Sequence, residues 1–132
     1  MKKNLFITIV FLLYLNLLGF TQCTPDPIYT TAGVPGIFPT PTEGIASGTV
    51  GTAYSQNFTV IIPADTTVTL PNVGTVTATI NKVTITGITG LPAGLTYTCT
   101  PTSCEWPGGT DGCFVINGTP TQIGTFTFSV TL

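Results

Sequence analysis

The sequence has very little charge, and above all very little positive charge. It contains no histidine and no arginine, and charged residues make up 6% of the chain, against about 25% in an average globular domain. Of its three lysines, Lys2 and Lys3 stand at the N-terminus and only Lys82 lies further along. The acidic residues are Asp26, Glu43, Asp65, Glu105 and Asp111. A chain with one cation beyond its first residues cannot neutralise a nucleic-acid backbone or bind an anionic membrane surface, so we expect neither as a partner.

The missing histidine also excludes most nucleophilic catalysis. Ser-His and Cys-His arrangements need an imidazole base, and Lys82 is the only side-chain amine outside the first three residues. The acids are isolated along the chain, which does not favour the paired carboxylates of a glycoside hydrolase. We therefore expect a non-enzymatic chain without catalytic residues.

Metal-binding patterns are absent as well. There is no Cys-x-x-Cys pair, and the spacing of Cys99, Cys104 and Cys113 does not match a zinc ribbon. Calcium requires six to eight oxygen ligands, whereas Asp65 and Asp111 each stand alone among turn-forming residues. We expect these two acids to cap turns, and we expect no metal and no cofactor.

The N-terminus has the pattern of an export signal. Lys2 and Lys3 precede an apolar run from Leu5 to Phe20, which predicts a signal peptide over 1–22, helical in its apolar part. A transmembrane anchor is the competing interpretation, because the run is close to the ~17 residues that can span a bilayer. A lipid-modified Cys23 is a third, less favoured because Gln22 is not a small residue. The signal peptide predicts a secreted or cell-surface protein with no membrane contact after cleavage.

The cysteines support this location. Four cysteines in a short exported chain predict disulfides, because the compartments outside the cytoplasm are oxidising. We prefer a bond from Cys99 or Cys104 to Cys113, with the other of the two close to Cys23. Three full pairings of four cysteines exist, and the sequence does not choose among them.

The rest of the chain has the composition of β-structure, with many Thr, Val and Ile residues between Gly and Pro turns. Residues 23–50 contain five prolines and predict an irregular lead-in segment, which could lie along the domain's edge. Residues 51–132 predict one antiparallel β-sandwich domain with no helix.

Alternating apolar residues mark the expected strands. In the segment 54–62 the apolar residues Tyr54, Phe58, Val60 and Ile62 stand at even positions. A run from Thr75 to Ile88 changes parity at Asn81-Lys82, where we expect a bulge or a change of sheet. Asp65 to Thr67 predicts a turn or an edge segment. A further strand contains Leu95, Tyr97 and Cys99, and another runs over 113–116. In the last strand we expect four apolar residues to face inward: Phe126, Phe128, Val130 and Leu132.

Several short motifs resemble a known module. The segments GLPAGLTY at 90–97, INGTPT at 116–121 and GTFTF at 124–128, with GTAYS at 51–55, resemble the putative-Ig, dystroglycan-type cadherin-like domain. The resemblance covers about residues 48–132, and it implies an immunoglobulin-like β-sandwich.

The cysteine-bearing stretch 99–113, together with the early CTPDP at 23–27, resembles exported bacterial proteins that carry a C-terminal type IX secretion sorting domain. No such domain follows Leu132, so we expect the chain to be the N-terminal part of a longer protein. Thr66, in Asp65-Thr66-Thr67, resembles the short motif at which bacteria with type IX secretion attach O-glycans.

Trp106 is the candidate ligand-binding residue. It is the only tryptophan, on a Pro- and Gly-rich loop between cysteines, with Tyr97 in the strand that leads to the loop. An exposed aromatic side chain on a rigid loop can stack on a sugar ring or a partner surface. The alternative is that Trp106 folds back and covers the disulfide.

These observations favour a non-enzymatic, immunoglobulin-like structural spacer or adhesion module. The first alternative is a carbohydrate- or protein-binding module that uses Trp106 to hold a cell-surface glycan or protein. The second is the accessory domain of a hydrolase encoded downstream.

Overall fold

The computed structural model describes residues 22–132, and the predicted signal peptide at 1–22 therefore lies outside the described residues except for Gln22. The elements in chain order are α2 (Pro27–Ala32), β1 (Gly36–Phe38), β2 (Tyr54–Ile61), β3 (Asp65–Leu70), β4 (Gly74–Thr79), β5 (Lys82–Thr84), β6 (Gly87–Thr89), β7 (Leu95–Thr100), β8 (Glu105–Pro107), β9 (Asp111–Gly118) and β10 (Ser129–Thr131). The described chain is thus built mostly of antiparallel β-sheets, as the composition predicts, and it also contains one short helix that the composition does not predict.

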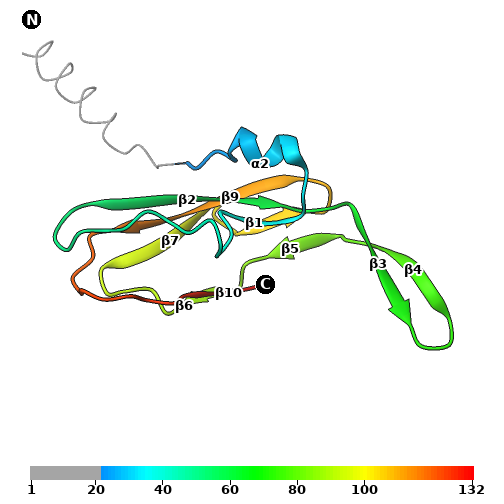
Figure 1. Cartoon of the computed structure of the whole chain (residues 1–132). Coiled ribbons are helices and arrows are strands. Elements are labelled where there is room, and N and C mark those ends of the chain that lie inside the picture. Colours follow the sequence, from blue (N-terminus) through cyan, green and yellow to red (C-terminus); the bar gives the residue numbers. More distant parts are fainter. Residues whose placement is uncertain (1–21) are drawn as a thin grey trace, which may run out of the picture.

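A four-stranded sheet forms the larger layer (Figure 1). Its order is β1-β2-β9-β7, and all neighbours are antiparallel. The strand β9 lies in the centre and pairs with β2 along its whole length, from Tyr54↔Gly118 to Ile61↔Asp111. Residues far apart in the sequence are therefore joined by the longest ladder of the fold.

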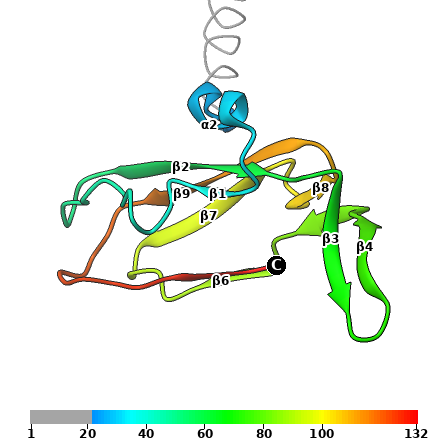
Figure 2. The same ribbon diagram turned by 45° about the vertical axis from the view of Figure 1, so that its right-hand side comes forward.

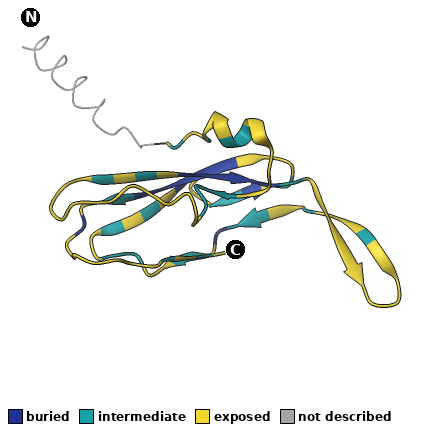
Figure 3. Ribbon diagram, viewed as in Figure 1, coloured by how far each residue is buried: buried dark blue, intermediate teal, exposed yellow. Residues whose placement is uncertain are grey.

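A smaller layer lies against one face of this sheet. It contains the pair β6–β10, with the pair β5–β8 beside it (Figures 1 and 2). Phe58 and Phe114 stack between the layers with ring centroids 4.7 Å apart, and Phe128 meets Phe58 edge-on at 5.8 Å. The predicted alternation of β2 is confirmed on this side, because Phe58, Val60 and Ile62 are all buried (Figure 3).

The opposite face of the sheet is also covered, which the alternation did not predict. Thr59 and Cys113 lie directly across from each other on that face and are each 1% exposed. The backbone N–H of Asp26 donates to Thr59 Oγ1 at 2.8 Å, and Asn57 Nδ2 donates to the carbonyl oxygen of Thr24 at 2.9 Å. The start of the lead-in segment therefore lies across the sheet rather than along its edge.

The lead-in segment also contains regular structure, so the prediction of an irregular segment was wrong. Asp26 caps α2 by accepting from Ile28 N at 3.0 Å, Pro27 takes the first turn, and Gly33 ends the helix in the left-handed region with φ 62°. A six-residue helix is too short to show a hydrophobic period. In the sequence, these capping residues are therefore the only indication of α2.

The strand β1 also lies within the predicted irregular segment. It pairs with β2 from Gly36↔Ile61 to Phe38↔Thr59 and forms the edge of the sheet. Pro35 and Pro39 stand immediately outside its three residues. Proline is tolerated at a sheet edge and outside the ladder, where its missing N–H costs no strand pairing.

The hairpin β3–β4 projects from the two layers (Figures 1 and 2). It pairs Asp65↔Thr79 through Leu70↔Gly74, and nearly all of its residues are exposed. Residues 65–67, expected to form a turn or an edge segment, therefore begin the first strand of a two-stranded hairpin. The predicted break at Asn81-Lys82 is confirmed, because β4 ends at Thr79 and β5 begins in a different sheet at Lys82.

The last strand is shorter than its alternation predicts. Only Ser129–Thr131 pair, with β6. Phe128 and Val130 pack against the core as expected, but Phe126 is 40% and Leu132 63% exposed. The prediction was therefore wrong for these two residues. For Phe126 the reason is that, within residues 22–132, no strand pairs with its part of the segment.

Candidate functional site

Two disulfides tie the fold together, and their pairing differs from the preferred one. Cys23 bonds to Cys113, and Cys99 bonds to Cys104. Cys99 lies opposite Phe114 and belongs to the core, whereas Cys113 is the neighbour of Phe114 along β9 and faces the other side of the sheet. Because side chains alternate across a strand, Cys99 and Cys113 lie on opposite faces and cannot meet.

The bond to Cys113 also occupies the Sγ atom of Cys23, so this thiol is not free for lipid attachment. Two disulfides indicate an oxidising, extracellular environment. Within residues 22–132, no helix has the length and hydropathy that a bilayer-spanning helix requires.

Trp106 lies in the core and is 3% exposed. Its strand β8 pairs Trp106 with Val83, and Nε1 donates to the carbonyl oxygen of Thr100 at 2.8 Å. The indole packs against Gly112 so closely that a Cβ atom there would lie 2.3 Å from Nε1. A side chain enclosed in this way has no free face for a sugar ring, so the binding role predicted for an exposed Trp106 does not fit. The alternative, in which Trp106 folds back and covers the disulfide, agrees with its burial in the core cluster that contains Cys99 and against which Cys104 packs.

Tyr97 does not join Trp106 in an exposed site either. It is half-buried, lies opposite Ile116, and packs against the core from β7 together with Leu95 and Cys99. This placement confirms the predicted inward face of the strand. Tyr97 therefore does not provide a second exposed aromatic side chain for the binding site proposed at Trp106.

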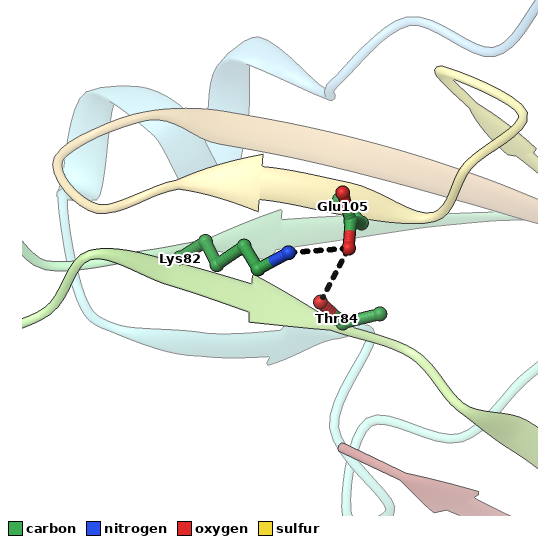
Figure 4. A network of polar contacts seen from close by, with 3 residues as sticks. All are labelled: Lys82, Thr84 and Glu105. Atoms are coloured by element: carbon green, nitrogen blue, oxygen red, sulfur yellow. Dashed lines mark hydrogen bonds and ion pairs between the residues drawn. The ribbon is translucent and has the colours of Figure 1, made fainter.

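The one lysine of the described chain is paired. Lys82 Nζ lies 2.6 Å from Glu105 Oε1, to which the Thr84 hydroxyl also donates at 3.4 Å (Figure 4). The hydrogen bond and charge of Lys82 lower the pKa of the Glu105 carboxyl. Both side chains are exposed, so water and salt screen the attraction and the pair adds little to stability.

The other acidic side chains do not form a cluster in the described part of the chain. Asp65 and Asp111 each begin a strand, β3 and β9, instead of capping a turn. Among residues 22–132 no three His, Cys, Asp or Glu side chains lie close enough together to hold a metal ion. Glu43 accepts from the backbone N–H of Thr40 at 2.6 Å and from its hydroxyl at 2.8 Å, and these bonds lower the pKa of its carboxyl.

An apolar groove between the two layers is the feature that the sequence did not reveal. A hollow of about 620 Å³ lies between residues 45–50 and 122–128, with Tyr54, Leu95 and Ile116 beneath it. A second hollow of about 460 Å³ lies between 37–45 and 126–130, above Phe58 and Phe114. Both are lined by Ile45, Phe126 and Phe128, and together we name them the interlayer groove.

Thr66 is accessible for modification. It lies in β3 opposite Ala78, and both Asp65 and Thr66 are exposed on the projecting hairpin. The structure thus presents the short motif to solvent, while the identity of any attached group stays a prediction.

Comparison of the chain with models of protein families, with curated proteins and with solved structures finds no match.

Proposed function

We propose that this chain is an exported, non-enzymatic, immunoglobulin-like module that acts as a structural spacer or adhesion domain. The strand order carries the proposal. An immunoglobulin-type sandwich places strands A, B, E and D in one sheet and C, F and G in the other. The order β1-β2-β9-β7 corresponds to A-B-E-D, and the pair β6–β10 corresponds to C-F. The motif resemblance at 90–97 and 116–128 supports the same fold.

The disulfide between Cys23 and Cys113 supports the spacer role. It joins the start of the described chain to the central strand β9 across 90 residues of sequence. A stretching force applied between the two ends of residues 22–132 therefore passes through this covalent bond and bypasses the residues that lie between the two cysteines. Residues 24–112 cannot extend, even if the sheets come apart.

Single-molecule force spectroscopy tests this role. With handles near Gln22 and at Leu132, only residues 114–132 of the oxidised chain can extend, to about 65 Å at ~3.5 Å per residue. In the variant C23A/C113A nearly the whole described chain is released, and we expect an extension of about 370 Å by the same measure.

The variant C99A/C104A is the matched control, because its short loop lies inside the larger one. It should keep the short extension of the wild-type chain. A full-length extension of the oxidised wild type, or extension without a resolvable unfolding event, would contradict the proposal that the module is a spacer that resists stretching.

The proposed export by a type IX route predicts an O-glycan on Thr66. Intact-mass spectrometry of the chain purified from its native host should show added hexose, and T66A should abolish it. Thr69→Ala is the control, because Thr69 is an exposed residue of the same strand that does not follow an acid. An unmodified mass for the native protein would exclude this modification.

A further inference from the structure

We propose that the disulfide between Cys99 and Cys104 is a thiol-exchange site, which a small dithiol opens while the bond between Cys23 and Cys113 stays closed. The described chain then has two covalent states with the same fold. The inference goes beyond the spacer role, because it assigns a redox reaction to a bond that the spacer role does not use.

The sulfur of Cys104 is the point of attack. Cys104 is half-buried, whereas Cys99 is 3% exposed and belongs to the core cluster. Thiol–disulfide exchange requires the attacking thiolate to reach one of the two sulfurs, so an external thiol meets Cys104 first. Cys23 of the other disulfide is also half-buried, and exposure alone therefore does not make the two bonds differ.

The backbone of Cys104 makes its bond the more easily reduced of the two. Among residues 22–132 only two residues other than glycine have a positive φ, Asn72 at 66° and Cys104 at 55°. Asparagine is common in this left-handed region, but the conformation is unfavourable for most residues that carry a Cβ atom. Opening the bond to Cys99 removes one constraint that holds Cys104 there. Strained disulfides are reduced more readily than relaxed ones, and neither Cys23 nor Cys113 has a positive φ.

The fold does not depend on the bond between Cys99 and Cys104. The two cysteines are 5 residues apart, against 90 for the other disulfide, and a short closed loop restricts the unfolded chain less than a long one. All six residues of β7 are paired with β9 by the backbone. A reduced, buried Cys99 resembles a small apolar side chain, so it suits the core that surrounds it.

The four-stranded sheet keeps the two disulfides apart. Thr100 lies opposite Cys113, so Cys99 is only one position away from the other disulfide along the ladder. Side chains alternate across a strand, however. Cys99 faces the core, whereas Cys113 shares the opposite face with Thr59. A thiolate at Cys99 therefore has no path to the sulfur of Cys113, and the pairing does not scramble in the folded chain.

The exchange takes two steps. One thiolate of the dithiol attacks Cys104 Sγ and forms a mixed disulfide, while the electron pair of the broken bond moves to Cys99 Sγ, which takes up a proton. The second thiolate of the reagent then attacks the reagent's own sulfur in the mixed disulfide, and Cys104 leaves and is protonated. The dithiol loses two electrons and two protons and becomes a disulfide, and the protein gains two thiols.

Reduction should loosen the contacts of the turn at 100–104. The carbonyl oxygen of Thr100 accepts from Trp106 Nε1 at 2.8 Å, and its Oγ1 accepts from the backbone N–H of Cys23 at 3.2 Å. The carbonyl oxygen of Cys104 accepts from the backbone N–H of Ile85 at 3.0 Å. The turn thus connects β7 to the β5–β8 pair and to the start of the described chain, so the bond within it controls how firmly these parts are held together.

Limited reduction with dithiothreitol tests the proposal. The oxidised chain is incubated with increasing dithiothreitol without denaturant, alkylated, and mapped by mass spectrometry. We expect alkylation of Cys99 and Cys104 at reagent concentrations at least tenfold lower than those that open the bond between Cys23 and Cys113. The fluorescence of Trp106, the only tryptophan, should rise, because a disulfide packed in the same cluster quenches an indole. The amide of Ile85 should exchange faster.

The variant C99A/C104A is the matched control, and over the same range of dithiothreitol it should show neither alkylation nor a rise in fluorescence. Oxidised dithiothreitol should restore the bond between Cys99 and Cys104 in the reduced wild type and form no other. The proposal is overturned if the bond between Cys23 and Cys113 opens first or at the same concentration. Resistance of the bond between Cys99 and Cys104 until urea unfolds the chain, or scrambled pairing after reoxidation, would overturn it as well. The force-extension experiment contains no reductant, so its result is independent of this one.

Discussion

Replacing Trp106 by alanine is expected to lower the free energy of unfolding by about 3–5 kcal/mol, as for other buried large aromatic residues. The side chain is 3% exposed and belongs to the core cluster with Cys99 and Phe114. Its removal leaves a cavity, and it also leaves the carbonyl oxygen of Thr100 without the indole donor. Domains of this size are stable by only about 5–15 kcal/mol, so a large share of the total would be lost. Chemical denaturation of the oxidised protein measures the loss.

Gly112→Ala tests the same contact from its other side. The added Cβ atom would lie 2.3–2.6 Å from three atoms of the indole ring, so the ring must shift, at a cost of about 1–3 kcal/mol. In the double variant W106A/G112A the methyl group enters the space that the ring has left. The two losses should therefore not add.

Ile28→Ala is the control for both changes, because Ile28 is 72% exposed on α2. It should change stability by no more than about 0.5 kcal/mol. If Trp106→Ala lowered the free energy of unfolding by as little as the Ile28→Ala control does, the indole would lie at the surface, and its proposed role in binding would be restored.

Removing the disulfide between Cys23 and Cys113 is expected to cost about twice as much stability as removing the one between Cys99 and Cys104. In the chain-entropy model a bond that spans 90 residues contributes about 4.5 kcal/mol, because it restricts a long unfolded loop. A bond that spans 5 residues contributes about 2 kcal/mol on the same basis.

The variants C23A/C113A and C99A/C104A test this order by urea unfolding under non-reducing conditions. Alanine is suitable because Cys99 and Cys113 are buried and a polar replacement would add a desolvation cost. Equal losses, or a greater loss for C99A/C104A, would show that native contacts around Cys104 matter more than loop closure.

The predictable part of the fold is the part that local side-chain alternation determines. A period of two places Phe58 and Val60 on one face of β2, and Leu95, Tyr97 and Cys99 on one face of β7, whatever the partner strands are. The change of parity at Asn81-Lys82 likewise announces a change of sheet. The helix α2 gave only its capping residues as a signal, because six residues are too few to show a helical period.

The candidate site was less predictable. The composition of the Trp106 loop is the same whether the indole faces solvent or the core, and only the glycine at 112 leaves room for it inside. The interlayer groove depends on residues 37–50 and 122–130, which no short-range pattern connects. Its only sequence signal was the strict alternation of 125–128, which led us to expect a paired strand there.

By itself, the sequence determined a mostly β chain stabilised by disulfides, since residue types and their spacing control which backbone conformations are favourable and which face of each strand is apolar. Only the tertiary structure decided which cysteines pair, that Trp106 is buried and that the lead-in segment covers the outer face at Thr59. It also decided that, within residues 22–132, the backbone of 122–127 has no backbone partner. Each of these depends on which remote segment lies against a given face or edge. A local pattern carries no information about its distant neighbour, because the same alternation fits a strand that is paired, covered or open.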